Sequence, residues 1–303
     1  MPKISLRKKI SEGIFLLDGA MGTQLIARGI KGGVCNDYLN IDSPDTIFGI
    51  HRAYFQAGSN AVLTNTFGAN KFALGRHGLG DKVKEINTAA VKIARRAAGE
   101  GRYVLGDIGP SGDFLEPLGN LKADELANAF RQQAEVLLAG GVDGFIIETM
   151  TSLDEAAIAI EAVKSVSCDE LPVFASMAFD KVAKGFKTMM GVDVESAVAK
   201  MVSLDVNVVG FNCGTSSLDE YVELAKKFVS AVNTLDKKVL VFAEPNAGKP
   251  ELVDGRTIYK VSSEDFASAA EKIHSAGVNI IGGCCGTGPE HIKAIAEKIK
   301  NKI

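Results

Sequence analysis

Eight short runs of Val, Ile, Leu and Phe recur along the chain, and the stretches between them are long enough to hold helices. The runs lie at 14–20, 61–67, 103–109, 144–149, 173–179, 206–213, 239–246 and 279–285. Strands that are apolar on both faces are typical of a parallel sheet that helices cover on each side. The sequence therefore predicts an α/β protein with eight parallel strands.

The stretches between the runs have the spacing of amphipathic helices. In 123–141, Leu126, Phe130, Ala134 and Leu137 fall on one side, and the stretch ends in glycines, as helices often do. The stretches 153–166 and 263–277 behave in the same way. The phrases "AGSNAVLTNT", "GGVDGFIIET" and "AGVNIIGGCC" repeat one order of helix end, glycine, polar turn and strand. This repetition indicates a βα unit used many times.

Eight consecutive βα units favour a closed (β/α)8 TIM-type barrel over an open sheet. No linker rich in Gly, Pro or Ser interrupts the pattern, so we expect residues 1–303 to form a single domain. The longest gaps follow the carboxyl ends of strands, where barrels of this kind build their active sites. These gaps lie at 21–43, 67–81, 109–122 and 246–261.

Composition excludes several classes of partner. The net charge of −3 gives no reason to expect nucleic acid or an anionic membrane as a partner. No apolar run approaches the roughly 20 residues of a membrane span. The N-terminal stretch is basic but lacks the apolar segment of a secretion signal, so we expect a cytoplasmic protein.

Three of the five cysteines occupy notable places. Cys213 ends the sixth predicted strand, and Cys284 and Cys285 end the eighth, within "IIGGCCGTGPEH". Neighbouring side chains on a regular strand point to opposite faces, but the glycines around this pair allow the backbone to bend. Three converging thiolates with an open fourth position would form a zinc site of the catalytic type. The alternative is a buried cysteine cluster without metal.

A zinc ion with three thiolates has a net charge of about −1 and is a poor Lewis acid for activating water. It suits a fourth thiol, whose pKa of about 8.5 the metal would lower, while the excess charge keeps the bound sulfur nucleophilic. The chemistry that this cluster favours is alkyl transfer to a thiol. Cys35 and Cys168 lie in polar segments that we expect to be loops.

Other polar residues also fall at predicted strand ends. Asp18 and Glu148 are placed to bind a substrate ammonium group, although Asp18 also suits a turn and Glu148 also suits an internal ion pair. Gly19 and the following Ala20 belong to the first loop, whose backbone amides can approach a carboxylate. Thr66 and Glu244 are further candidates for substrate contacts, and both can equally be structural.

Several motifs, in order along nearly the whole chain, resemble the homocysteine S-methyltransferase family. They are "LLDGAMGTQL" (16–25), "LTNTFGAN" (63–70), "GDIGPSG" (106–112), "IIETM" (146–150), "GFNCG" (210–214), "EPNAGKP" (244–250) and "GGCCGTGPEHI" (282–292). The similarity is greatest to the homocysteine-binding module of cobalamin-dependent methionine synthase. The resemblance implies a (β/α)8 barrel in which Cys213, Cys284 and Cys285 bind zinc. It also implies that Asn246 fills the fourth position until the substrate thiol displaces it.

The resemblance implies methyl transfer to the thiol of L-homocysteine, giving methionine. Asp18 and Glu148 would hold the substrate's amino group, and amides of the first loop its carboxylate. The donor would be methylcobalamin carried on another domain or on a separate corrinoid protein. A donor such as S-methylmethionine or S-adenosylmethionine is the alternative within the family. Outside it, a zinc-dependent lyase or aldolase barrel, or a non-catalytic thiol-binding or metal-storage module, stays open.

Overall fold

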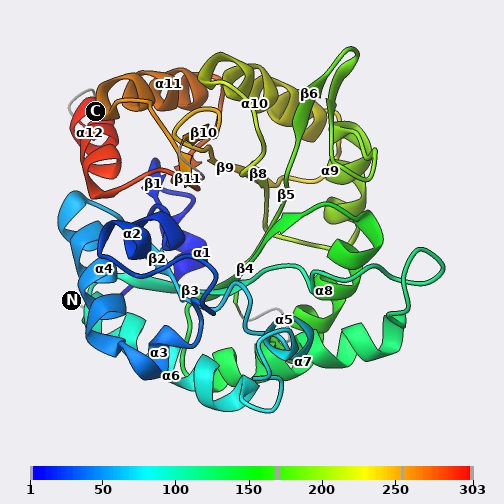
Figure 1. Cartoon of the computed structure of the whole chain (residues 1–303). Coiled ribbons are helices and arrows are strands. Elements are labelled where there is room, and N and C mark those ends of the chain that lie inside the picture. The colour runs from blue at the N-terminus through cyan, green and yellow to red at the C-terminus, as the bar shows by residue number, and fades with distance from the viewer. Residues whose placement is uncertain (1–2, 168–170, 254–255, 301–303) are drawn as a thin grey trace.

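A computed structural model describes residues 3–167, 171–253 and 256–300, and within these ranges eight strands form one parallel sheet (Figure 1). The sheet runs in the order β1-β12-β9-β8-β5-β4-β3-β2. Its strands are β1 (Phe15–Leu16), β2 (Ala61–Leu63), β3 (Tyr103–Ile108), β4 (Gly144–Met150), β5 (Val173–Met177), β8 (Val208–Asn212), β9 (Leu240–Glu244) and β12 (Ile280–Ile281). Each lies within one of the eight predicted runs or ends one residue beyond it, so the predicted strands are confirmed.

The barrel closes between its first and second strands through Asn60, which lies just before β2. The Asn60 N–H donates to the Leu16 carbonyl at 2.7 Å, and the Asn60 side chain accepts the Leu16 N–H at 2.8 Å. Asp143 and Asn207, at the same position before β4 and β8, accept N–H groups of the neighbouring strands in the same way. The polar residue in the repeated turn therefore joins adjacent strands at their amino ends.

Helices surround the barrel and follow its strands in order around the ring (Figure 1). The larger ones are α4 (Pro44–Ala57), α6 (Val83–Ala98), α7 (Ala123–Ala139), α8 (Leu153–Ser167), α9 (Val194–Ser203), α10 (Leu218–Asn233), α11 (Ser263–Ser275) and α12 (Pro289–Lys300). The shorter ones are α1 (Leu6–Lys9), α2 (Gly22–Ala27), α3 (Leu39–Asp42) and α5 (Lys71–Gly75). The (β/α)8 barrel predicted from the repeated units is therefore the observed fold.

The barrel interior has an apolar lower layer. Leu105, Ile146, Phe174 and Phe242 pack there with Leu6 of α1, which covers the amino end of the barrel. The rings of Phe174 and Phe242 meet edge to face with 5.7 Å between their centroids. Because side chains on one face of a strand recur every second residue, each strand that fills this layer also sends a later side chain into the layer above.

The long loops lie at the carboxyl ends of the strands, as predicted, and they carry structure of their own. The gap 21–43 contains α2 and α3, the gap 67–81 contains α5, and the gap 246–261 contains the hairpin β10 (Glu251–Val253) and β11 (Arg256–Ile258). A second hairpin, β6 (Asp180–Val182) and β7 (Gly185–Lys187), follows β5 and was not expected. Cys168, expected in a loop, lies outside the described residues.

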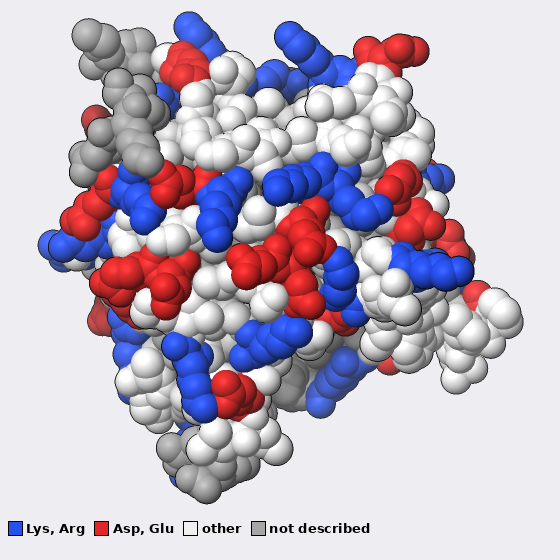
Figure 2. All heavy atoms as spheres, turned by 90° about the horizontal axis from the view of Figure 1, so that it is seen from above, with Lys and Arg blue, Asp and Glu red and all other residues white. Residues whose placement is uncertain are grey.

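The outer surface over α10 and α11 carries charges of both signs (Figure 2). Ion pairs join neighbouring helices there, namely Lys227–Glu195, Lys272–Asp219 and Lys298–Glu271. This face therefore has no broad patch of a single sign. None of the helices in the described part of the chain is both long and apolar enough to cross a membrane.

We expect Phe242→Ala to lower the free energy of unfolding by about 3–5 kcal/mol, because the ring is fully buried and Leu105, Ile146 and Phe174 hold the cavity open. Denaturant titration followed by circular dichroism measures the change. Phe114→Ala is the matched control, since Phe114 is 50% exposed and its loss should alter the free energy by at most about 0.5 kcal/mol. Equal effects of the two substitutions would contradict this account of the core.

Candidate active site at the carboxyl ends of the strands

A cavity of about 390 Å³ opens where the carboxyl ends of the strands meet. All three predicted cysteines line it. Five carboxyl groups also line it, from Asp18, Asp37, Asp107, Glu148 and Glu244. No Lys, Arg or His among the residues that the structure describes contributes to the wall. The cavity is therefore acidic and rich in sulfur.

The sulfur atoms of Cys213, Cys284 and Cys285 lie within 4.8 Å of one another, and those of Cys284 and Cys285 are 3.9 Å apart. The convergence predicted from the strand positions is therefore present. A metal ion can be held by three or more thiol, imidazole or carboxyl side chains that lie close together. Within the described ranges, these three cysteines form such a group. The cluster can bind a metal through three sulfur ligands.

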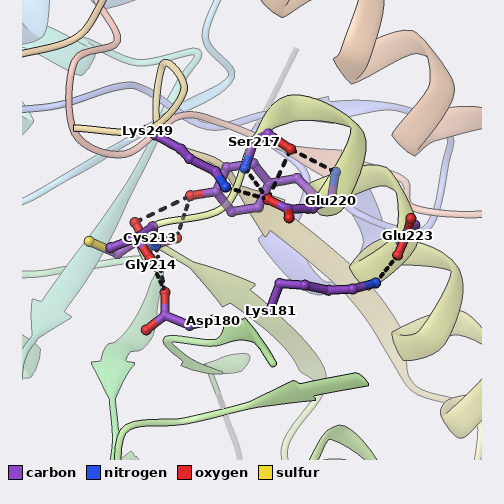
Figure 3. Close-up of polar contacts among 10 residues, drawn as sticks. Asp180, Lys181, Cys213, Gly214, Ser217, Glu220, Glu223 and Lys249 are labelled. Atoms are coloured by element: carbon purple, nitrogen blue, oxygen red, sulfur yellow. Dashed lines mark hydrogen bonds and ion pairs between the residues drawn. The ribbon is translucent and has the colours of Figure 1, made fainter. Parts of the chain in front are cut away.

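A tight turn after β8 places Cys213. Its backbone is left-handed with φ of 56°, and its carbonyl accepts a hydrogen bond from the Tyr221 hydroxyl of α10 at 2.7 Å. The Cys213 N–H donates to the Glu244 carbonyl at 3.3 Å. The sulfur points away from α10, as Figure 3 shows. A non-glycine residue in this conformation is strained, and such strain is typical of functional sites.

Polar contacts from three segments hold the chain just after Cys213 (Figure 3). The Asp180 carboxylate of β6 accepts the Thr215 N–H at 2.6 Å and its hydroxyl at 2.7 Å. Ser217 and Glu220 form a capping box at the start of α10, and Lys249 of the loop after β9 pairs with Glu220 at 3.2 Å. The unexpected hairpin and the loop after β9 therefore both brace the turn that carries Cys213.

The two adjacent cysteines follow β12 in irregular backbone, so the alternation of a regular strand does not apply to them. The Cys284 N–H donates to the Pro245 carbonyl at 2.8 Å, and the Cys285 carbonyl accepts the Ala247 N–H at 2.9 Å. A Cβ at Gly282 would lie 2.9 Å from a Glu244 carboxyl oxygen, and Gly286 has φ of 81°. The glycines have the role predicted for them, because larger residues would clash or strain the turn.

Asn246 lies between the two residues whose backbones bond to Cys284 and Cys285. Its side-chain nitrogen donates to the Gly214 carbonyl at 2.6 Å, next to Cys213. Its side-chain oxygen is buried and has no hydrogen-bond partner. An unpaired buried oxygen is costly unless something else satisfies it. The side chain is therefore fastened beside the thiols with one acceptor left free.

The three thiols share their protons unevenly. Hydrogen bonds to Cys213 and Cys285 raise the pKa of Cys284 well above its ordinary value. Hydrogen bonds from Cys213 and Cys284 lower the pKa of Cys285 to about 3. The bond with Cys284 lowers the pKa of Cys213, but the bond with Cys285 and burial outweigh it and raise that pKa to about 12. The hydrogen bonds within the cluster therefore favour ionisation of Cys285 and oppose ionisation of Cys213 and Cys284.

Burial raises the pKa of each carboxyl at the bottom of the cavity. It does so strongly for Asp18, Asp107 and Glu244, and it raises the pKa of Glu148 to about 7. All four side chains are at most 9% exposed. A cation that enters this cavity would favour the ionised carboxyls and replace the missing protein partners. The electrostatics therefore favour a ligand that brings an ammonium group.

Glu148 is tied directly to the turn that carries Cys213. Asn212, the last residue of β8, donates from its side-chain nitrogen to the Glu148 carboxylate and to the Thr149 hydroxyl, while its oxygen accepts the Thr149 N–H at 2.8 Å. Thr149 has φ of 59° at an irregularity in β4. The carboxyl group and the sulfur cluster are thus held in one hydrogen-bonded unit.

The remaining predicted substrate residues differ in position. Gly19 and Ala20 line the cavity, but the Ala20 N–H already donates to the Thr287 hydroxyl at 3.2 Å. The Asp18 carboxylate accepts the Leu63 N–H at 3.1 Å, which fixes it at the junction of β1 and β2. Thr66 does not line the cavity, since its hydroxyl donates to the Asp107 carbonyl at 2.7 Å. Its direct contact with substrate stays a prediction.

Four residues of the site were not singled out from the sequence, namely Asp37, Asp107, Thr149 and Asn212. Asp107 had the same sequence signal as Glu148. Each is a carboxyl residue that follows an interior apolar residue of the same strand by two positions. Asn212 had the weaker signal of directly preceding Cys213. Asp37 lies in the loop before α3, where no periodicity distinguishes it.

The sequence model of the family described as homocysteine S-methyltransferase matches residues 15–299 of this chain. The chain belongs to the homocysteine S-methyltransferase family. It is 32% identical to the methionine synthases of Mycobacterium tuberculosis and Mycobacterium leprae, over 96% and 97% of this chain respectively. In each case the match covers 25% of the relative, so the chain spans about a quarter of the length of these curated relatives.

Solved structures support the family's barrel fold. The metallated form of the homocysteine methyltransferase MmuM from Escherichia coli matches with a TM-score of 0.78 and 22% identity, covering 97% of this chain and 99% of that one. The carboxyl transferase domain of Rhizobium etli pyruvate carboxylase with 3-bromopyruvate matches with a TM-score of 0.52 and 13% identity, covering 96% of this chain and 48% of that one. At these identities the likeness establishes the fold.

We start from reduced protein from which a chelator has removed all metal. Near pH 7 we expect it to release about two protons for each divalent metal ion that binds, because Cys213 and Cys284 must both ionise to become ligands. The metal dissociation constant should therefore fall by about a hundredfold for each unit of rising pH. Calorimetric titration with zinc in buffers of different ionisation enthalpy measures the proton count.

Cys284→Ala should weaken metal binding severely, whereas Cys35→Ala, which removes a free thiol outside the cluster, should leave it unchanged. Undiminished affinity in Cys284→Ala, or no proton release in the native chain, would rule out a three-thiolate site.

Proposed function

We propose that this chain binds zinc through Cys213, Cys284 and Cys285, and that it methylates the thiol of L-homocysteine to give methionine. The proposed methyl donor is methylcobalamin carried on another domain or on a separate corrinoid protein. The observation that carries the proposal is the meeting of three thiols and several uncompensated buried carboxyls in one cavity. Sulfur ligands suit a thiol-binding metal, and the carboxyls suit the ammonium group of an amino acid.

The donor set fits zinc. Zinc–sulfur bonds of about 2.3 Å in a tetrahedron place neighbouring sulfurs about 3.8 Å apart, close to the 3.9 Å between Cys284 and Cys285. The free side-chain oxygen of Asn246 is the proposed fourth ligand in the absence of substrate. When bound, zinc would lower the pKa of a substrate thiol and keep its sulfur nucleophilic.

The chain's own residues would bind and orient the amino acid. Asp18 and Glu148 are proposed to hold the ammonium group. Asp18 is already fixed by the Leu63 N–H of β2, and Glu148 by the Asn212 side chain of β8. Glu244, the last residue of β9, lines the same cavity and is a further candidate for a substrate contact. The substrate carboxylate is proposed to meet the backbone of the first loop at Gly19, because the Ala20 N–H is engaged by Thr287.

Exposed apolar side chains at the cavity end of the barrel support the proposal that a large partner delivers the methyl group. Of the eleven large apolar side chains that are exposed among the described residues, all but Ile4 lie on loops that follow the carboxyl ends of strands. We call these ten the apolar rim; they are Ile26, Val34, Phe67, Phe114, Leu118, Val182, Met189, Met190, Leu252 and Val253. All ten lie on segments at the end of the barrel that holds the cavity, and exposed apolar surface that gathers on one face of a protein marks an interaction site.

We propose further that residues 1–303 act as one homocysteine-binding domain, and that a corrinoid-carrying partner docks on the apolar rim. The matched relatives are methionine synthases of about four times this length, which supports a partner for this domain. Ligand thiols must stay reduced, so the proposed location is the cytoplasm.

We expect the cobalt-substituted protein to show a new sulfur-to-cobalt charge-transfer band when L-homocysteine is added, because the substrate thiolate becomes a fourth sulfur ligand. Absorption spectroscopy measures it. L-Homoserine, which has a hydroxyl in place of the thiol, should leave the spectrum unchanged, and Cys284→Ala should abolish the response. A spectrum that does not change when homocysteine is added would refute the proposed function.

We expect Leu118→Asp combined with Leu252→Asp to slow methyl transfer from a protein-bound methylcobalamin at least about tenfold, because both side chains lie on the apolar rim and are more than 70% exposed. Homocysteine affinity should not change. Ile4→Asp is the matched control, since Ile4 is exposed but lies away from the rim. If the chain instead turns over free S-methylmethionine, and the Leu118 and Leu252 substitutions do not change that rate, the result would support a sulfonium donor.

A further inference from the structure

Asp107 is a cavity residue to which the proposed mechanism gives no role. It lies on β3 two residues after Leu105, so it projects into the barrel interior directly above the apolar layer. Its side chain is 4% exposed and lines the cavity. One of its carboxyl oxygens, Oδ1, is buried without a hydrogen-bond partner. A buried oxygen without a partner, on a side chain that lines a cavity, is costly unless a donor reaches it.

The backbone of Asp107 is held on both sides. Its N–H donates to the Thr64 hydroxyl at 3.0 Å, and its carbonyl accepts the Thr66 hydroxyl at 2.7 Å. The Gln133 side chain of α7 also donates to this carbonyl, at 3.4 Å. These contacts fix the direction of the side chain, and they give Thr66 the task of positioning Asp107.

The carboxyl groups of Asp107 and Glu148 lie close enough to each other for a hydrogen bond. Two carboxylates buried side by side repel each other, so a proton shared between them stabilises the pair. Burial, followed by the charges of Glu148 and Glu244, raises the pKa of Asp107 well above its ordinary value, which favours the proton on Asp107. Asp107 would then be the donor, and Glu148 would keep the charge.

We infer that Asp107 binds the substrate's ammonium group as a neutral acid, donating its O–H to Glu148 and accepting an ammonium N–H at Oδ1. This inference rests on the proposed function and adds a third acceptor to Asp18 and Glu148. An ammonium group has three N–H donors, so the three acceptors Asp18, Asp107 and Glu148 satisfy it fully. Because Asp107 carries no charge, the pair matches the single positive charge of the ligand.

The test uses substitutions that separate charge from hydrogen bonding. Asp107→Asn keeps a donor toward Glu148 and an acceptor toward the ligand, whereas Asp107→Leu keeps only the approximate size. Binding of L-homocysteine to the zinc-loaded protein is measured by calorimetry. 4-Mercaptobutanoate is measured beside it, since this ligand has the thiol and carboxylate but lacks the ammonium group.

Asp107→Asn should bind L-homocysteine within about threefold of the native chain. Asp107→Leu should bind it at least about tenfold more weakly, the effect of leaving a buried charged-group hydrogen bond unmade. Neither change should affect 4-mercaptobutanoate by more than about threefold. Asp124→Asn, an exposed carboxyl change at the start of α7, is the control and should change nothing.

Two results would overturn the inference while leaving the proposed function standing. One is a loss in Asp107→Asn as large as in Asp107→Leu, which would mean that Asp107 acts as an anion. The other is equal weakening of both ligands, which would mean a structural role. If Asp107→Leu fails to fold, Asp107→Ala removes the same hydrogen-bonding atoms and provides the comparison. A native chain that binds neither ligand through its thiol would refute the proposed function itself, and this inference with it.

Discussion

Every strand of this closed parallel barrel must send alternate side chains inward, and the site depends on that constraint. At the lower level the inward positions are Leu105, Ile146 and Phe242, which fill the barrel. Two residues later on the same strands they are Asp107, Glu148 and Glu244. One alternation therefore builds an apolar layer and then an acidic one. The acidic layer stays buried because the layer below keeps the barrel closed and dry.

The sulfur cluster depends on the opposite property, departure from regular strand structure. Cys213 lies in a left-handed turn, and Cys284 and Cys285 lie in a glycine-rich bend, so none follows the alternation of the strands. Hydrogen bonds with Tyr221, with the Pro245 carbonyl and with the Ala247 N–H hold these irregular segments together. Asn212 then links the cluster to Glu148. The sulfur and carboxyl halves of the cavity are thus joined by hydrogen bonds.

Much of this arrangement was predictable because local and global signals agree. The eight apolar runs became eight strands, since short apolar runs suit strands that a parallel sheet buries on both faces. The three cysteines were assigned correctly to one cluster, because strand ends in a barrel share one edge. Asp107 was overlooked although its signal equals that of Glu148, and the hairpin after β5 was overlooked because its short strands carry little apolar pattern. Thr66 was expected to contact substrate, yet its hydroxyl is bonded to the Asp107 carbonyl.

The sequence by itself determined the barrel, the order of its units and the residue types that gather at one end, because these depend on periodicity along the chain. Only the tertiary structure decided which carboxyls touch, which oxygens stay unpaired and which hydroxyls are already engaged. These properties depend on distances between residues far apart in the sequence, such as the proximity of Asp107 and Glu148. The free oxygens of Asn246 and Asp107 emerge only when the surrounding segments are packed, because an acceptor is unpaired only relative to its neighbours in space.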